Sequence, residues 1–109
     1  MQLKVKRDQQ QKGLLIKRMT YSLSIRVEFT EEERAVINKA NLGGTLLYRS
    51  ESGKTIVTPK SLKDGHFWES DDLAAIANLH EGVIDGCKKL KAHLEVSDKF
   101  KDGEGVIEI

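Results

Sequence analysis

The clearest pattern in the chain is a strict alternation of apolar and polar residues between residues 21 and 29. Its apolar positions are Tyr21, Leu23, Ile25, Val27 and Phe29, and its polar positions are Ser22, Ser24, Arg26 and Glu28. A period of two predicts a β-strand with one buried face and one wet face. We expect this strand to begin as early as Leu14, and its wet face to meet solvent or a partner in an antiparallel sheet.

A shorter alternation of the same kind lies near the start of the chain. Leu3 and Val5 alternate with Lys4 and Lys6, which predicts a half-buried strand over residues 3–6. Asp8–Gly13 is polar and ends in glycine, so it predicts the loop of a β-hairpin. If the two strands pair, the two lysines join the wet face of the longer strand or its edge.

The segment after the long strand carries the signals of a helix start. Thr30 is followed by three glutamates, and Glu33 stands at the spacing of a capping box. Acidic residues in a first turn also suit the positive end of the helix dipole. We expect a helix from residue 31 to about Ala40 that stops at Asn41–Gly44, where a glycine takes a positive φ.

A longer helical region is predicted after residue 70. Its apolar residues repeat at intervals of three and four, and they are Leu73, Ile76, Val83, Ile84, Cys87, Leu90 and Leu94. Ser70 or Asp71 would cap its start. Gly82 and Gly86 each cost about 1 kcal/mol relative to alanine inside a helix. We therefore expect a break near residues 78–82, with a short helix followed by a longer one.

The remaining segments complete a single α+β domain over residues 1–109. We predict strands at Thr45–Arg49 and Thr55–Thr58 around a turn at Ser50–Gly53. A helical turn or loop at Ser61–Gly65 and a strand at His66–Glu69 follow. At the end of the chain we predict a turn at Asp102–Gly103 and a terminal strand at Val106–Ile109. The fold class that follows is one antiparallel, curved sheet of five or six strands. Two helical regions pack on its apolar face, in the order ββ-α-ββ-β-α-β.

The charge of the chain is divided unevenly along its length. Residues 1–27 hold seven Lys or Arg and one acid, which gives +6, and residues 28–109 hold eleven Lys or Arg and sixteen acids, which gives −5, in agreement with the net +1. Such a division is typical of a nucleic-acid-binding arm. It is equally expected if the two parts pack against each other and neutralise. The sequence leaves both interpretations open.

The single cysteine and the absence of a long apolar run indicate the compartment. One Cys cannot form an internal disulfide, and small secreted domains usually need several. No apolar stretch follows the charged start of the chain, so we expect no signal peptide. No run approaches the roughly 18 apolar residues of a membrane span. We expect a cytoplasmic protein that does not use a membrane.

Two short motifs resemble ligand sites without meeting their requirements. Gly53-Lys54-Thr55 matches the end of a P-loop, but Tyr48 stands where the first glycine of that motif is needed, and a strand follows instead of a helix. We interpret it as a hairpin turn. Residues 98–103 resemble a calcium loop, but Phe100 replaces an oxygen ligand and Ile109 stands at the position of the closing glutamate.

The cysteine and the histidines also suggest chemistry that their spacing does not support. Cys87 and His80 would lie about two helical turns apart, roughly 10 Å, which is too far for a thiol–imidazole pair. Cys87 falls on the apolar stripe, so we expect it in the core. Among His66, His80 and His93 no pair has the spacing of a zinc site on a helix. We therefore predict no catalytic, cofactor-binding or metal-binding residues, and no small-molecule substrate.

The basic N-terminal part is the feature that indicates a function. Its candidate interaction face consists of Lys4, Lys6, Lys17, Arg18, Ser22, Ser24 and Arg26. We expect a small non-enzymatic cytoplasmic interaction or accessory protein, which contacts a protein partner or a second copy of itself as a homodimer. The alternative is a nucleic-acid-binding module that uses the basic N-terminal β-ribbon. Aromatic residues for base stacking are scarce there, since Tyr21 lies on the apolar face.

Overall fold

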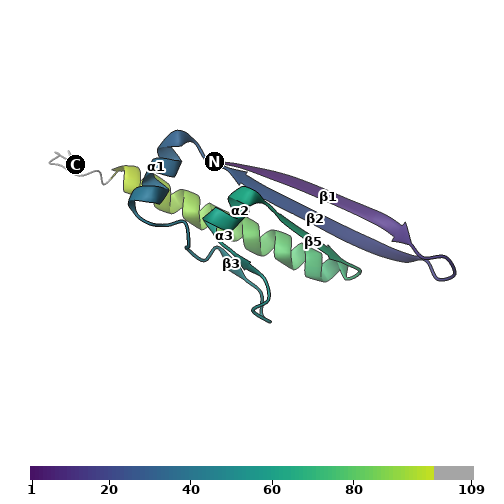
Figure 1. The fold of residues 1–109 in the computed structure, drawn as a ribbon. Helices are drawn as coiled ribbons and strands as arrows, with labels where there is room; N and C mark the ends of the chain where they lie inside the picture. Colours follow the sequence, from purple (N-terminus) through teal and green to yellow (C-terminus); the bar gives the residue numbers. More distant parts are fainter. Residues whose placement is uncertain (100–109) are drawn as a thin grey trace, which may run out of the picture.

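The computed structural model describes the backbone of residues 1–99 and the side chains of residues 1–96. Its elements, shown in Figure 1, are β1 (Gln2–Lys12), β2 (Arg18–Glu28), α1 (Glu31–Lys39), β3 (Tyr48–Arg49), β4 (Ile56–Val57), α2 (Pro59–Asp64), β5 (His66–Ser70) and α3 (Leu73–Lys99). The α+β class with an antiparallel sheet and helices is confirmed. The turn predicted at Asp102–Gly103 and the strand predicted at Val106–Ile109 lie outside the described residues.

The main sheet has three strands in the order β1-β2-β5, so β2 lies in the centre. The prediction of five or six strands in one sheet is wrong. β3 and β4 contain only two residues each, and they pair with each other in a separate ribbon. That ribbon does not reach an edge of the main sheet because the chain entering it lies against α3.

The alternation in β2 gives the sheet its two faces. Leu23, Ile25 and Val27 are buried on the inner face, which α3 covers. Residues paired across neighbouring strands share a face, so Leu3 and Val5 of β1 also point inward. The apolar stripe predicted for the long strand is confirmed, and it forms the floor of the core.

The boundaries of the β1–β2 hairpin differ from the prediction. β1 and β2 each have eleven residues and pair without interruption from Gln2↔Glu28 to Lys12↔Arg18. The segment Asp8–Lys12 is therefore strand, not loop, and Leu14–Ile16 belongs to the turn. Gly13 begins this turn with φ 117°, and a Cβ there would lie 2.1 Å from the carbonyl oxygen of Ile16. The position thus requires glycine.

The start of α1 confirms the capping box. The Thr30 side chain accepts a hydrogen bond from the Glu33 backbone N–H (3.1 Å), and the Glu33 carboxylate accepts one from the Thr30 N–H (3.0 Å). Burial raises the pKa of Glu33, but hydrogen bonds from the Met1 ammonium and from Thr30 outweigh it and hold the pKa below its ordinary value. At the other end Asn41 takes the positive φ of 54°, where a glycine was expected.

α3 is one continuous helix, so the predicted break near residues 78–82 is wrong. Its two glycines give room for the chain that crosses it before β3. A Cβ on Gly82 would lie 2.4 Å from the Tyr48 ring, and one on Gly86 would lie 2.1 Å from the Leu47 carbonyl oxygen. The start of the helix also differs. Asp72, not Ser70 or Asp71, accepts hydrogen bonds from the N–H groups of Ala74 and Ala75, at 3.0 and 3.4 Å.

The core consists of two adjoining clusters. The larger one joins β2, β4, α2 and α3 and contains Leu23, Ile25, Val27, Val57, Leu62, Ile76, Val83 and Cys87. The smaller one joins α1 and α3 through Ile37, Leu90 and Leu94. The larger cluster packs α3 against the sheet, and the smaller one packs α1 against the C-terminal part of α3. The N-terminus lies at the same end of the molecule as α1 (Figure 1).

Candidate interaction hairpin

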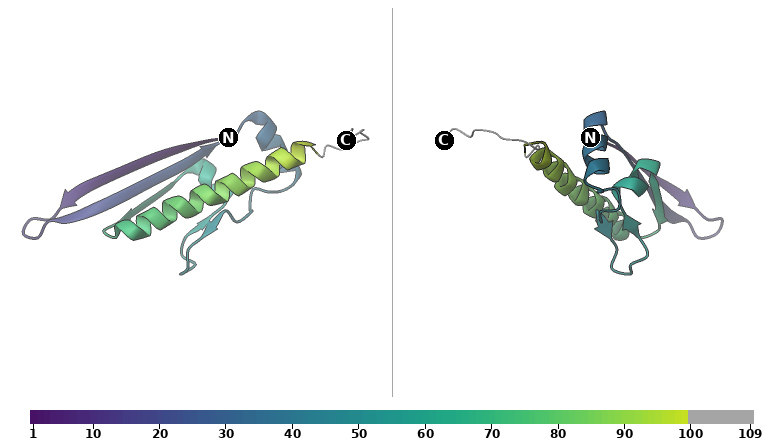
Figure 2. Two further views of the ribbon diagram at one scale, coloured as in Figure 1. Left: turned by 180° about the vertical axis from the view of Figure 1, so that it is seen from behind. Right: turned by 60° about the vertical axis from the view of Figure 1, so that its left-hand side comes forward.

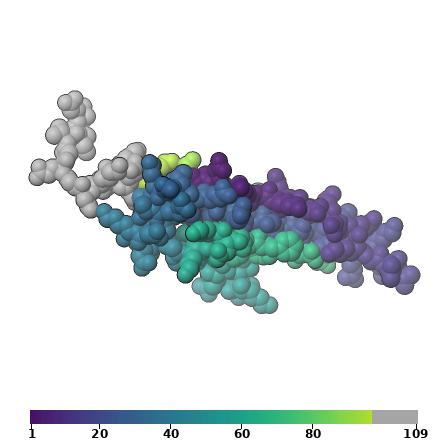
Figure 3. Space-filling model, turned by 45° about the horizontal axis from the view of Figure 1, so that its top comes forward, coloured from purple at the N-terminus to yellow at the C-terminus, as the bar shows by residue number. Residues whose placement is uncertain are grey.

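The β1–β2 hairpin projects beyond the rest of the molecule. β5 pairs with β2 only between Tyr21 and Ile25. No third strand therefore pairs with residues 8–20, which we call the distal hairpin. Figure 2 shows this ribbon extending past the N-terminal end of α3. In Figure 3, β1 lies uncovered along the visible face of the molecule. All residues from Lys6 to Met19 are exposed.

The outer face of the sheet brings together most of the residues predicted for the interaction face. The register places Lys4 opposite Arg26 and Lys6 opposite Ser24. Ser22 and Arg18 follow on the same face because side chains alternate along a strand. Lys17 lies in the turn and is not part of the sheet. The prediction that Lys4 and Lys6 join the wet face of β2 is confirmed.

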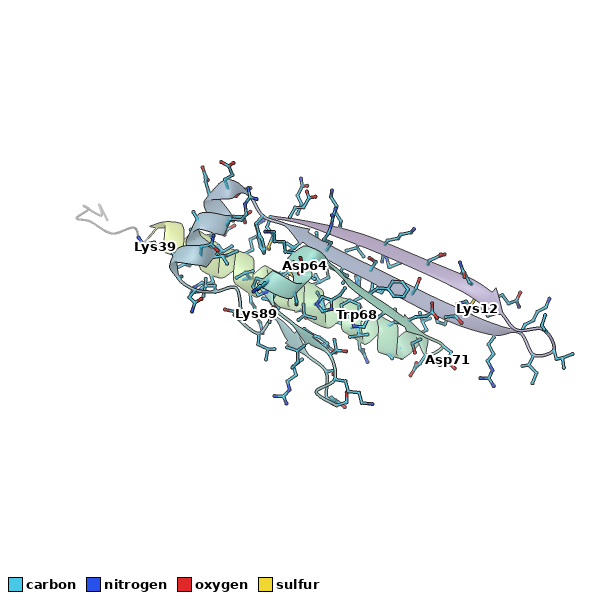
Figure 4. The ribbon with its side chains drawn as sticks, in the orientation of Figure 1. Lys12, Lys39, Asp64, Trp68, Asp71 and Lys89 are labelled. Atoms are coloured by element: carbon cyan, nitrogen blue, oxygen red, sulfur yellow. The ribbon has the colours of Figure 1, made fainter. Side chains whose placement is uncertain are left out.

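Three cations of the hairpin form ion pairs with acidic residues from later in the chain. Lys4 contacts Glu28 at 2.8 Å, and Arg26 contacts the same carboxylate at 3.4 Å. The hydrogen bond and charge of Lys4 lower the pKa of Glu28. Lys12, near the end of the hairpin in Figure 4, contacts Glu69 of β5 at 3.4 Å. Part of the charge asymmetry is thus neutralised within the molecule.

The other four cations of the hairpin are Lys6, Arg7, Lys17 and Arg18, and none has an ion pair among the side chains of residues 1–96. Residues 9–20 contain three cations and no acid. The distal hairpin therefore presents uncompensated positive charge to solvent. This charge favours a partner with carboxylate or phosphate groups.

The end of the hairpin exposes three consecutive apolar side chains. Leu14 and Leu15 are each 98% exposed and Ile16 is 73% exposed. The sequence prediction missed this group, because it assigned Leu14 to the start of the strand. The available signal was the absence of alternation: three apolar residues in a row lie between Gly13 and Lys17. Such a run cannot keep one face wet and one buried.

A groove lies on the inner side of the hairpin, between β1 and the first half of α3. Its volume is about 550 Å³, and its lining is Arg7, Leu23, Leu73, Ile76, Ala77, His80, Glu81, Ile84, Asp85 and Lys88. The floor is apolar, whereas Arg7 on the strand and Glu81 and Asp85 on the helix carry charge. The inner face of β1 is thus only partly covered by the helix.

β5 places its two aromatic residues on opposite faces, as predicted for adjacent strand positions. Trp68 packs against the core, and Phe67 is 64% exposed on the outer face beside Ser24. His66 stacks on Trp68 with ring centroids 5.1 Å apart, and its Nε2 lies 2.9 Å from the Ser61 hydroxyl. Burial lowers the pKa of His66. These contacts give the histidine a structural role.

The cysteine lies where the sequence places it. Cys87 is buried in the larger core cluster, and burial raises its pKa to about 11. The thiol is thus protonated at neutral pH and has the character of a small apolar side chain. Among the side chains that the structure describes, those of residues 1–96, no group of His, Cys, Asp and Glu is arranged to hold a metal ion.

Comparisons with known proteins find no match: no family model, no curated protein and no solved structure is significantly similar to this chain. Within the described part of the chain, no helix combines the length and apolar character needed to cross a membrane.

Proposed function

We propose that this chain is a non-enzymatic interaction module that contacts another protein chain through its β1–β2 hairpin. The observation that carries the proposal is the exposed apolar group Leu14–Ile16 at the end of a projecting, positively charged ribbon. The lone buried cysteine supports a cytoplasmic setting.

The apolar end of the hairpin is the strongest support for a binding role. Single exposed apolar residues are common on protein surfaces, whereas contiguous exposed groups mark binding sites. Leu14, Leu15 and Ile16 are adjacent and contribute nothing to either core cluster. Their burial against a partner would give the favourable free energy that the isolated chain does not obtain from them.

A protein partner suits this surface better than a nucleic acid. The three apolar side chains require an apolar surface, and aromatic anchors for base stacking are scarce on the hairpin, where Tyr21 points inward. β1 also offers a free strand edge, a common means of binding another polypeptide. A homodimer is one form of such an interaction.

One observation favours nucleic acid as the second candidate. Lys6, Arg7, Lys17 and Arg18 have no ion pair within the described residues, and a two-stranded ribbon fits the major groove of about 12 Å. If phosphates are the ligand, replacing Lys4, Lys6, Lys17 and Arg18 by Gln will flatten the salt dependence of binding to mixed-sequence DNA and RNA.

Capture from a nuclease-treated native lysate, quantified by mass spectrometry, tests the proposal. The wild-type chain is compared with the triple variant Leu14→Ser, Leu15→Ser, Ile16→Ser. Leu46→Ser with Ile56→Ser is the matched control, because these apolar side chains are 55% and 50% exposed elsewhere on the surface. We expect the triple variant alone to lose its protein partners. Equal capture by all three chains would contradict the proposal.

A further inference from the structure

The outer edge of β1 is the largest unused hydrogen-bonding surface of the sheet. β1 is an edge strand of eleven residues, paired with β2 on one side only. Its register with β2 contains no bulge, and its sequence contains no proline. Proteins usually protect such an edge with bulges, prolines or charges, and β1 has only charges. These charges therefore decide which strand can pair with it.

Two copies of β1 can pair antiparallel in a small number of registers. Side chains alternate between faces, so even-numbered residues must lie opposite even-numbered residues for the two sheets to share their inner and outer faces. In the register of complete overlap, Gln2 lies opposite Lys12 and all eleven residues are paired. Shifts by two residues along the partner strand give the neighbouring alternatives.

The register of complete overlap is also the one that the outer-face charges favour. It places Lys6 opposite Asp8 of the other copy, and it does so twice because of the two-fold symmetry. A shift in one direction places Lys4 opposite Asp8 twice, but it also places Lys6 opposite Lys6. A shift in the other places Lys4 opposite Lys12 and Asp8 opposite Asp8. Opposite charges across a strand pair stabilise it, and like charges destabilise it.

On the inner face, complete overlap brings the two Arg7 side chains together at the two-fold axis. Arg7 lines the groove that also contains Glu81, Asp85 and Lys88 of α3. In the dimer, two arginines and two lysines would then share the groove lining with four carboxylates, so the charges balance. The groove thus supplies the charge that offsets the one like-charged pair in this register.

The same register directs the end of each hairpin toward acidic residues of the other copy. After Lys12 the partner chain continues past Gln2 and Met1, toward the end of the molecule where α1 lies (Figure 1). The first turn of α1 exposes Glu31 and Glu32, and neither has an ion pair within residues 1–99. Lys17 and Arg18 of the partner are the complementary cations.

We propose that a second copy of this chain occupies the β1 edge, antiparallel and in the register of complete overlap. The two three-stranded sheets form one six-stranded sheet, and each distal hairpin docks beside α1 of its partner. This inference rests on the proposed function and specifies its partner. The basic first quarter of the chain is then neutralised between copies as well as within one.

Disulfide trapping of the purified full chain tests the register. Residues facing each other in an antiparallel pair have Cα atoms about 4.5–5.5 Å apart, within the range of a disulfide. Arg7→Cys is therefore expected to give a covalent dimer under mild oxidation. Gln9→Cys is the matched control, because it lies on the same face but about 13 Å from its own copy. Cys87 does not interfere, since it is buried. Equal cross-linking of both variants, or of neither, would overturn the register.

A charge exchange tests the same pairing without cross-linking. Asp8→Lys places a lysine opposite Lys6 and is expected to weaken the dimer by at least tenfold in dissociation constant, measured by light scattering after size-exclusion chromatography. Adding Lys6→Asp to Asp8→Lys restores the opposite charges and is expected to restore the dimer. Both side chains are exposed, so the monomer fold is unaffected. Glu51→Lys makes the same change of charge at an exposed site in the turn of the separate β3–β4 ribbon, and it is the control.

The outcomes separate this inference from the proposed function. If the purified wild-type chain stays monomeric at high concentration while capture from lysate still depends on Leu14–Ile16, the second copy is not the partner, and the proposed function stands. If the purified chain stays monomeric and capture from lysate does not depend on Leu14–Ile16, both the inference and the proposed function are wrong. A dimer that the single exchange leaves intact overturns the register.

Discussion

Two leucines of the same hairpin have opposite environments. Leu23 lies in the half of β2 that β5 and α3 cover, and its side chain is fully buried. Leu15 lies at the end of the distal hairpin and is 98% exposed. The residue type is the same, and only the neighbouring elements differ. The comparison separates residues that hold the domain together from residues that are available for a partner.

The largest expected difference comes from removing each of these leucines in turn. Leu23→Ala would leave a cavity among Ile25, Ile76 and Val83, and such changes destabilise proteins by about 2–5 kcal/mol. Leu15→Ala removes no described contact with the core, so a change within about 0.5 kcal/mol is expected. Urea unfolding followed by circular dichroism measures both. A large loss of stability in Leu15→Ala would show that the end of the distal hairpin packs against the rest of the domain.

The second prediction concerns the close contact that keeps the β3–β4 ribbon on α3. Gly86→Ala improves helix propensity by about 1 kcal/mol, but its Cβ would meet the Leu47 carbonyl oxygen at 2.1 Å. A backbone atom cannot rotate away, so we expect destabilisation at the upper end of the ~1–3 kcal/mol typical of overpacking. Thermal unfolding measures it. Gly44→Ala is the control, because a Cβ there meets nothing within 4 Å.

This contact also explains what the sequence could not predict about α3. The spacing of its apolar residues correctly indicated a helix, and helix propensity correctly counted Gly82 and Gly86 as unfavourable. The error was to treat that cost as a break. Glycine fits both positions because Leu47 and Tyr48, from a distant part of the chain, approach the helix there. Propensity is local, and this contact is tertiary.

The hairpin shows the same division between local and tertiary information. Alternation identified the inner and outer faces of β2, and with them six of the seven candidate interaction residues. It could not give the length of β1, because Gln9, Gln10 and Gln11 have neither a strong strand propensity nor an apolar face. Their strand conformation follows from pairing with β2. The exposure of Leu14–Ile16 depends on that pairing too.

The third prediction tests whether Cys87 is buried in the core. Cys87→Ser places a hydroxyl in the larger core cluster, one helical turn from Val83, and we expect a loss of about 2 kcal/mol in the free energy of unfolding. In the native wild type, a thiol reagent at neutral pH should label Cys87 only as fast as the domain opens. Rapid labelling of the folded chain would contradict its burial.

The raised pKa of this thiol also gives a pH dependence. Because the pKa rises from 9.0 to about 11 on folding, the folded state disfavours the thiolate. The stability is therefore complete below pH 9 and declines as the pH rises toward about 11. The Cys87→Ser chain lacks this decline, and a comparison of the two unfolding curves across that range isolates the contribution of the thiol.

The smallest effect is expected at Thr30, where the hairpin passes into α1. Thr30→Ala removes the side-chain oxygen that accepts from the Glu33 N–H, and the loss of such a cap costs about 1 kcal/mol. Thr45→Ala is the matched control, because that exposed hydroxyl makes no hydrogen bond with the described residues. Urea unfolding should separate the two variants. The proposed dimer uses Glu31 and Glu32, which stay in place, so any self-association of the folded Thr30→Ala chain is expected to equal that of the wild type. A weakened dimer at full folding would mean that the cap itself orients α1 toward the partner's hairpin.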